Sequence, residues 1–349
     1  MELILNNPSH SPFIMKLWQY VARRLILLIP VVIGVTLITF TVSHVIPANP
    51  ARAWAGQKAP PEVVKKIAEK YHLNDPLYMQ YYYYLSGLVK GDWGYSHSEH
   101  RPVTECLSDY FPATFELTLW AMIIAIPLGI YLGVISAVKR NKLPDHLSRV
   151  FALSGVSMPI FWLGLLLILL FYSYLGILPA SGRGISPSHT YTGLYILDSI
   201  LSIDGRALID DLRHIILPAI TLSYATLAVI TRMTRSSMLE VLRLDYIKTA
   251  RAKGLPNKVV IYRHALRNAM IPTLTVSGLA FAGLLGGAVL TETIFSWPGM
   301  GRYAYHAIST LDFPAIMGVT FLMAVIFVIA NLIVDILYAY LDPRIKLGE

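Results

Sequence analysis

The sequence predicts an all-α integral membrane protein with six transmembrane helices. Of its 349 residues, 55% are hydrophobic and only 14% are charged, and the mean hydropathy is +0.55. A soluble chain of this length would carry more charge. Six stretches lack Asp, Glu, Lys and Arg, and each has about the 20 residues that a helix needs to cross a ~30 Å hydrocarbon core. These stretches are 25–51, 117–138, 150–182, 214–231, 268–291 and 313–334.

Each stretch supplies one expected span. We place the spans at 25–46, 117–138, 150–178, 215–231, 270–291 and 314–340. The first could instead be a signal peptide, because Arg23 and Arg24 precede it. However, it is longer than the ~7–15 residues of a signal-peptide core, and five more spans follow. The single cysteine, Cys106, leaves no internal disulfide and no cysteine-based metal cluster.

The loops between the spans divide into two sets by charge. One set carries 18 basic and six acidic residues, and the other carries 11 basic and 13 acidic residues. Cytoplasmic loops keep the positive excess, so we expect both termini inside a plasma or inner membrane. The net charge of +8 then reflects topology, and we expect no nucleic-acid binding. The basic set is 1–24, 139–149, 232–268 and 342–349, and the other is 47–114, 177–214 and 292–314.

The outer segment 47–114 is long enough to form a cap outside the membrane. Its stretch 61–71 has helical periodicity, with Val63, Val64, Ile67, Ala68 and Tyr71 on one face. An aromatic stretch, 77–89, follows. Interfacial tyrosines could anchor such a cap to lipid headgroups. The alternative is that the cap forms a docking or gating surface for an external partner.

Motifs for chemical catalysis are absent. The sequence has no Gly-Lys dipeptide and therefore no phosphate-binding loop, and it has neither His-Glu-x-x-His nor Gly-x-Ser-x-Gly. His97 and His100 could form a metal pair, although two histidines in a polar loop are more often solvated. We expect no enzyme activity and no bound cofactor, so a partner must supply the energy for any work that the protein does.

The basic loop 232–268 is the most informative segment. Apolar residues recur at helical spacing up to Ala250, Gly254 and Pro256 then interrupt the pattern, and a second helical stretch leads into the fifth span. We call 242–265 the elbow. A basic elbow could lie on anionic lipid or insert into a groove on a cytoplasmic protein. A glycine at one defined place favours the second interpretation, because glycine reaches positive φ without steric cost.

Several stretches resemble the permease subunits of the dipeptide, oligopeptide and nickel family of ABC importers, and the N-terminal pattern resembles the first of the two permeases. The matching stretches cover the chain from about Arg23 to Ile345. Lys248, Thr249 and Ala250 stand where the general family motif has Glu-Ala-Ala, and this form is the one that the peptide-type branch uses. The stretches include RRLILLIPVVIGVTLITF (23–40), DYIKTARAKG (245–254), RHALRNAMIP (263–272), TETIFSWPGMGRYAYHAI (291–308) and LDPRI (341–345).

The resemblance implies a type I ABC importer permease. It implies a permease domain over 115–341, an extracellular cap between the first two helices, and a cytoplasmic coupling helix between the fourth and fifth. Expected partners are a second permease, two cytoplasmic ATPases that bind ATP and Mg²⁺, an external substrate-binding protein, and membrane lipid. The residues expected to couple to the ATPases are Asp245, Lys248, Thr249, Ala250, Lys253 and Gly254. The small side chain of Ala250 is expected to seat the helix in a partner groove.

The resemblance also implies a substrate class. It points to a translocation path for a di- or oligopeptide, with oligosaccharides or a metal chelate as alternatives in the same importer class. A more remote alternative is a secondary transporter, which should carry buried carboxylates at mid-membrane; the sequence shows no clear example.

Overall fold

The computed structural model describes residues 17–44, 49–56, 58–286 and 288–341. The predicted tail 342–349 and most of the predicted N-terminal segment 1–24 lie outside these residues. The first half of the described chain contains α1 (Leu17–His44), α2 (Pro50–Ala55), α3 (Pro61–Lys70), α4 (Leu77–Lys90), β1 (Tyr95–Ser96), β2 (Arg101–Pro102), α5 (Val103–Val138), α6 (Leu143–Ser157), α7 (Ile160–Leu167) and the π-helical η1 (Ile168–Tyr174). The second half contains α8 (Tyr195–Leu201), α9 (Gly205–Val241), α10 (Asp245–Ala252), α11 (Asn257–Val259), the π-helical η2 (Val260–Ala265), α12 (Leu266–Leu285), α13 (Val289–Ile294), α14 (Met300–Ser309) and α15 (Phe313–Leu341).

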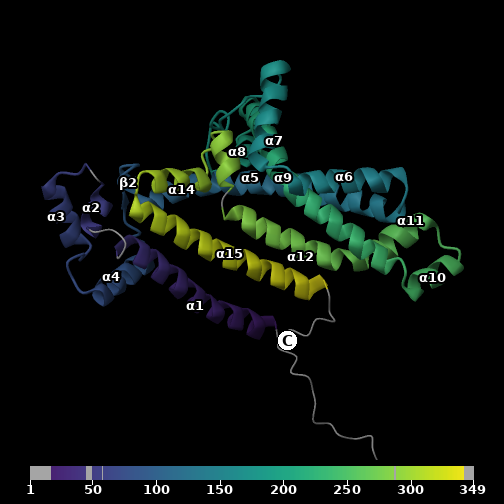
Figure 1. Ribbon diagram of the computed structural model, residues 1–349, viewed down its shortest axis with the longest axis horizontal. Coiled ribbons are helices and arrows are strands. Elements are labelled where there is room, and N and C mark those ends of the chain that lie inside the picture. Colours follow the sequence, from purple (N-terminus) through teal and green to yellow (C-terminus); the bar gives the residue numbers. More distant parts are fainter. Residues whose placement is uncertain (1–16, 45–48, 57, 287, 342–349) are drawn as a thin grey trace, which may run out of the picture.

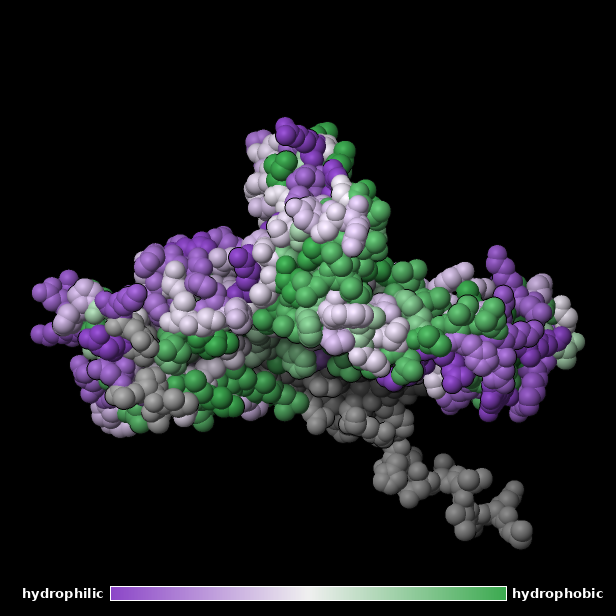
Figure 2. All heavy atoms as spheres, turned by 45° about the horizontal axis from the view of Figure 1, so that its top comes forward, coloured by the Kyte–Doolittle hydropathy of each residue, from purple (hydrophilic) through white to green (hydrophobic). Residues whose placement is uncertain are grey.

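The long helices run along the long axis of the molecule, with smaller elements at both ends. Helices α1, α5, α9, α12 and α15 form the long body, α2–α4 lie at one end, and α10 and α11 lie at the other (Figure 1). On the face shown in Figure 2, hydrophobic residues occupy the middle, and hydrophilic residues gather at both ends. An apolar belt between two polar ends suits a protein that crosses a bilayer. The predicted all-α membrane class is confirmed.

The number of spans can be compared with the six expected. Among the described residues, four helical segments are long and apolar enough to cross a membrane: 103–138, 205–241, 257–285 and 313–334. The pair α6 and α7–η1 adds a fifth if it crosses once. Helix α1 contains the apolar stretch Ile29–His44, which occupies most of the expected first span. The six-span topology is compatible with this set and stays a prediction.

The expected third span, 150–178, is not one straight helix. Helix α6 ends at Ser157, α7 begins at Ile160, and the two segments meet at 107°. Pro159 stands at the break and Met158 before it is extended, with ψ 125°. Proline has no backbone N–H and disfavours helical geometry in the residue that precedes it. Pro159 is visible in the sequence, but the uncharged stretch continues on both sides of it and therefore predicts one continuous span.

Three other helix boundaries differ from the expected spans. Helix α5 begins at Val103, inside the expected cap 47–114. Helix α9 extends well beyond 215–231 at both ends, so the first ten residues of the loop 232–268 are helical. The expected span 270–291 is divided between α12, which ends at Leu285, and α13. Charged residues mark where an apolar stretch stops, but a helix continues past them because its backbone bonds do not depend on side-chain polarity.

Glycines bring α5 and α9 into close contact. A Cβ atom on Gly133 would lie 2.5 Å from Cβ of Thr234, and one on Gly129 would lie 2.7 Å from a methyl group of Ile230. Both partners advance by four residues, so the two helices run in the same direction. Small residues at such positions allow membrane helices to approach closely. Gly283 and Gly287 have the same spacing, but Gly283 has no described neighbour within 4 Å of such an atom, and Gly287 lies outside the described residues.

We predict that Gly133→Val destabilises the protein, whereas Gly283→Val does not. Overpacking a tight helix contact costs about 1–3 kcal/mol, and Gly283 faces open space. Thermal unfolding can be followed with a thiol-reactive dye, because the single cysteine, Cys106, is fully buried. A lower unfolding temperature in Gly133→Val alone is expected. Equal unfolding temperatures in the two variants would contradict a tight contact between α5 and α9 at Gly133.

Candidate functional site

The elbow consists of α10, a glycine turn, α11 and η2. Helix α10 ends with Lys253 as its C-cap, and the chain reverses at Gly254, which has φ +75°. The amide of Gly254 donates to the carbonyl of Arg251 at 2.9 Å. Because a residue with a Cβ atom is strained at this φ, the predicted need for glycine is confirmed. Pro256 then caps α11, which continues through η2 into α12.

Four of the predicted coupling residues lie on the outer surface of the elbow. Asp245, Lys248, Thr249 and Lys253 are all exposed. The Lys248 ammonium lies 2.8 Å from the Asp245 carboxylate, and the Thr249 hydroxyl donates to the Asp245 carbonyl at 3.0 Å. Asp245 occupies the first turn of α10, where a negative charge favours the helix dipole. These residues present a polar surface that is available to a partner.

Ala250 does not face outward, and the expectation that its side chain seats in a partner groove is wrong. The residue is 8% exposed and belongs to a hydrophobic cluster within this chain. Its small side chain lets α10 approach the rest of the bundle. The cluster joins the elbow to α5, α9 and α12, and its buried members are Val134, Ala137, Met238, Val241, Ile247, Ala250, Val260, Ala265 and Ala269.

Two hydrogen bonds that were not predicted from the sequence connect α10 with η2 and the start of α12. The Tyr246 hydroxyl donates to the His264 carbonyl at 3.3 Å, and the Asn268 amide donates to the same hydroxyl at 2.6 Å. The side chains of Leu244 and Leu255, also in the elbow, are exposed. The sequence did show these two leucines in the basic loop, although their exposure is known only from the structure. The elbow thus offers apolar as well as polar contacts on a rigid base.

A buried carboxylate anchors α6 next to the elbow. Asp145 is fully buried and accepts from four donors: the Ser136 hydroxyl at 2.6 Å, the Asn141 amide at 2.9 Å, and two guanidinium nitrogens of Arg235 at 2.8 and 3.0 Å. We call these residues the inner network. It joins α5, α6 and α9, because each helix contributes one of the partners. The inner network therefore holds these three helices to one another.

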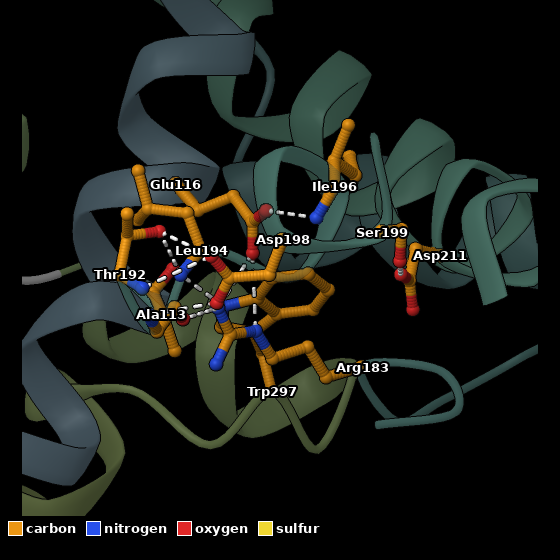
Figure 3. Close-up of polar contacts among 11 residues, drawn as sticks. Ala113, Glu116, Arg183, Thr192, Leu194, Ile196, Asp198, Ser199, Asp211 and Trp297 are labelled. Atoms are coloured by element: carbon orange, nitrogen blue, oxygen red, sulfur yellow. Dashed lines mark hydrogen bonds and ion pairs between the residues drawn. The ribbon is translucent and has the colours of Figure 1, made fainter. Parts of the chain in front are cut away.

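A second polar network surrounds Glu116, nearer the other end of α5 than the inner network (Figure 3). The Arg183 guanidinium donates to Glu116 on α5 at 2.6 and 3.1 Å and to the Gly193 carbonyl at 2.6 Å. It also lies over the Tyr195 ring, 3.9 Å from the centroid. The other oxygen of Glu116 accepts from the Ile196 amide at 2.8 Å. This outer network fastens the connection between η1 and α9 onto α5.

Two other buried carboxylates, Glu292 and Asp312, are also hydrogen-bonded within the chain. Glu292 accepts from the Thr114 hydroxyl and the Arg302 amide, both at 2.8 Å. Asp312 accepts from the hydroxyls of Ser96 and Ser98, which attaches the β1–β2 hairpin to α15. The structure thus contains buried carboxylates that the sequence-level interpretation did not recognise. Thr114 and the two hairpin serines are far in the chain from the carboxylates that they contact, so no local pattern reveals these pairs.

The connection between η1 and α9 is stabilised at its exposed end as well. Asp204 is the N-cap of α9 and accepts from the Ala207 amide at 3.1 Å. Ser188 donates its hydroxyl to the same carboxylate. This hydrogen bond and that of the amide hold the pKa of Asp204 below its usual range.

His97 and His100, the candidate metal pair, do not come together with further ligands. Within the described part of the chain no group of three or more His, Cys, Asp or Glu residues could hold a metal ion. His97 instead lies against Asp312, with 3.5 Å between Nδ1 and Oδ1. His100 is exposed and contributes its backbone carbonyl to a hydrogen bond from Tyr95.

An apolar groove of about 830 Å³ opens along α5, α12 and α15. Phe115, Met122, Phe281 and Ile329 are among the side chains that line it, and Ser277 supplies the one hydroxyl among its described lining residues. Such walls offer no partner for the charged termini of a small solute. The groove suits contact with another apolar surface.

We predict that Arg183→Met destabilises the protein far more than Arg101→Met. The first change leaves Glu116 buried without its ion-pair partner, at a cost of about 3–5 kcal/mol. Arg101 pairs with Asp109 on the surface, where such pairs contribute about 0–1 kcal/mol. The thiol-reactive unfolding assay measures both variants. Adding Glu116→Leu to Arg183→Met should recover most of the loss, and equal losses for the two arginine variants would contradict a buried pair.

Comparison with known proteins places this architecture in a family. Residues 125–347 match the model of the binding-protein-dependent transport system inner membrane component, and residues 17–118 match the model of the N-terminal part of such membrane components. Dipeptide transport system permease protein DppB of Alkalihalophilus pseudofirmus is 51% identical over 94% of this chain and 99% of its own length.

Two relatives from Escherichia coli K12 extend the comparison. The probable D,D-dipeptide transport system permease protein DdpB is 48% identical over 96% of this chain and 99% of its own length. The glutathione transport system permease protein GsiC is 39% identical over 94% of this chain and 99% of its own length. With nearly the whole chain matched by both family models and by these relatives, the protein belongs to the family of inner membrane components of binding-protein-dependent transport systems.

Proposed function

We propose that this chain is a permease subunit of an ATP-driven importer of dipeptides and other short peptides. The observation that carries the proposal is the 51% identity, over nearly the full length of both chains, to a protein named as a dipeptide transport system permease. Relatives at 46–48% identity are likewise named for dipeptides. The relative at 39% is named for glutathione, itself a small peptide. These names favour peptides over the oligosaccharide and metal-chelate alternatives.

The elbow is proposed to couple this subunit to two cytoplasmic ATPases, which bind the ATP and Mg²⁺ that this chain has no motif to hold. Its exposed surface includes Asp245, Lys248, Thr249 and Lys253, and its buried side is continuous with the cores of α5, α9 and α12. ATP can shift the permease between its inward-facing and outward-facing states only if the elbow makes different contacts with the ATPases in the two states. Because the elbow is packed against these three helices, we expect it to move with them as one body. A movement of the ATPases could then reach the membrane helices through the elbow. Ala250 contributes by fixing α10 to that base.

The remaining partners follow from the surfaces of the chain. The groove along α5, α12 and α15 is proposed to be covered by a second, homologous permease, so that the translocation path forms between the two subunits. The cap, α2–α4 with the β1–β2 hairpin, is proposed to receive an external substrate-binding protein. Lipid surrounds the remaining apolar belt of a cell membrane protein whose termini both face the cytoplasm.

The buried carboxylates do not favour the secondary-transporter alternative. Such a transporter needs carboxylates that bind and release a coupling ion. Among the described residues six carboxylate side chains are at most 2% exposed, and in five of them both oxygens accept hydrogen bonds. The five are Glu116, Asp145, Asp198, Glu292 and Asp312. The sixth, Asp211, accepts from Ser199 through one oxygen. Carboxylates with this many donors serve the structure of the bundle.

Uptake by the reconstituted complex tests the proposed function and the elbow together. Vesicles that contain both permeases, both ATPases and the binding protein, with ATP on the side of the ATPases, should accumulate a labelled dipeptide. Gly254→Val should abolish most of this uptake, because valine is strained at φ +75° and displaces the turn. This chain purified without the ATPases should hydrolyse no ATP.

Gly91 provides a matched control for Gly254. It also has positive φ, +83°, and no described neighbour would meet its Cβ atom within 4 Å, but it lies in the cap. Gly91→Val carries similar backbone strain at the end of the molecule away from the elbow, so it should leave co-purification of the ATPases unchanged, whereas Gly254→Val should reduce it. Normal uptake in Gly254→Val would refute the coupling role of the elbow. Accumulation of an oligosaccharide or a nickel chelate, but not of a dipeptide, would refute the substrate class.

Cysteine labelling tests the proposed orientation. In a background that carries Cys106→Ser, cysteines introduced at the exposed positions Lys66 and His189 should react with a membrane-impermeant maleimide in intact cells. Cysteines at Lys142 and Asn257, both also exposed, should react only after permeabilisation. The reason is the positive excess of the segments that contain the latter pair. Labelling of Asn257→Cys in intact cells would reverse the proposed orientation.

A further inference from the structure

The outer end of the molecule contains a cavity that is separate from both the elbow and the apolar groove. Its volume is about 1,040 Å³, and it opens between the cap and the bundle. Three segments that are far apart in the chain form its walls: α2 and α3, the β1–β2 hairpin, and the junction of α14 with α15. We call it the cap cavity. Its size is at the upper end of the ~300–1,000 Å³ typical of ligand sites.

Hydrogen-bond donors are concentrated in the walls of the cap cavity. Trp54 is 6% exposed, and its indole N–H has no acceptor within the described chain. Leaving a buried N–H without an acceptor costs about 1–3 kcal/mol. A ligand that offers an acceptor atom to the Trp54 indole would remove this cost. Lys70 contributes an ammonium group to the same lining, with Nζ 4.8 Å from the centroid of the Tyr71 ring. Trp54, Lys70 and Tyr71 all line the cavity.

The charge of the lining is positive. Lys58 and Lys70 line the cavity together with His97, His100 and His306, and the described lining residues include no carboxylate. Asp312 lies behind His97, but it is fully buried and both its oxygens accept hydrogen bonds from the chain itself. An anion that enters the cavity therefore meets donors and positive charge with no competing anion in the lining.

The nature of the donors selects the kind of anion. Arginine binds phosphate through a bidentate guanidinium, and no arginine is among the described residues that line the cavity. Two ammonium groups and an indole N–H suit an anion with a single charge. Val63, Ile67 and Leu311 add apolar surface beside them. A carboxylate next to an apolar group matches this combination.

We propose that the cap cavity binds a carboxylate that comes from outside the cell. The carboxylate is either the free C-terminus of a short peptide or an aspartate or glutamate side chain of the external binding protein; both sources rest on the proposed function, because they are its substrate and its partner. An occupant would touch α2, α3 and the start of α15 at once. Since Asp312 joins the hairpin to α15, occupancy holds the cap against the bundle.

Binding measurements on three variants test the proposal. Lys58→Gln and Lys70→Gln each remove one ammonium group, and Trp54→Phe removes the indole N–H but keeps an aromatic ring in the wall. Lys66→Gln is the matched control, because Lys66 is exposed on the same helix as Lys70 but does not line the cavity. Each cavity variant should weaken carboxylate binding about tenfold, as for the loss of one charge-assisted hydrogen bond. The control should bind like the parent protein.

Two probes distinguish the sources of the carboxylate. The first is Ala-Ala, with its C-terminal amide as the uncharged comparison, titrated onto the assembled permease–ATPase complex in lipid nanodiscs. The second is the binding protein, titrated onto the same complex. Weakened Ala-Ala binding in the cavity variants, with no binding of the amide, identifies the free peptide. Weakened affinity for the binding protein, with no binding of Ala-Ala, identifies an acidic side chain.

The proposal fails if the three cavity variants bind both probes as the Lys66→Gln complex does. Uptake of dipeptide by the Lys66→Gln complex separates this failure from failure of the proposed function. If that complex transports and the cavity variants bind normally, the importer stands and the carboxylate site is refuted. If no complex transports a dipeptide while the cavity variants still lose Ala-Ala binding, the site stands and the importer assignment is refuted.

Discussion

The close parallel contact of α5 with α9 is the interaction on which the other contacts of the bundle depend. Gly129 and Gly133 remove side chains at the contact, so that the backbones approach and the facing side chains of α9 fit between them. The two helices are long enough to carry separate groups at each end. Their outer halves contribute Glu116 and the cluster around Leu117 and Ile215, and their inner halves contribute Val134 and Met238 beneath the elbow.

Two of the buried carboxylates in this structure are paired with arginines. An isolated charge in a low-dielectric interior is expensive, and removing one member of a buried pair is strongly destabilising. The outer network pairs Glu116 with Arg183, and the inner network pairs Asp145 with Arg235. Both link segments that are distant in the chain and lie toward opposite ends of the apolar middle. The ends of the bundle are thereby made rigid, while the groove between α5, α12 and α15 remains apolar.

The packing at the elbow end bears on the proposed coupling of this subunit to ATPases. Because Ile247 and Ala250 share a core with residues of α5, α9 and α12, a displacement of α10 must move these helices or break well-packed contacts. Packed interfaces of this kind switch between discrete arrangements and do not deform continuously. At the opposite end, Asp312 connects the hairpin of the cap with α15. Both surfaces proposed to meet partners are thus joined directly to long helices.

The sequence by itself determined the membrane class, the apolar stretches, the glycine turn at Gly254 and the family resemblance, because each depends on composition or on local spacing. Tertiary structure alone decided that Ala250 points into the bundle, that Glu116 meets Arg183 across 67 residues, and that Trp54 lines a cavity bordered by the start of α15. Helical periodicity states which residues share a face, but not what covers that face. That choice belongs to long-range packing, in which the total buried surface and the pairing of buried charge decide between locally equivalent arrangements.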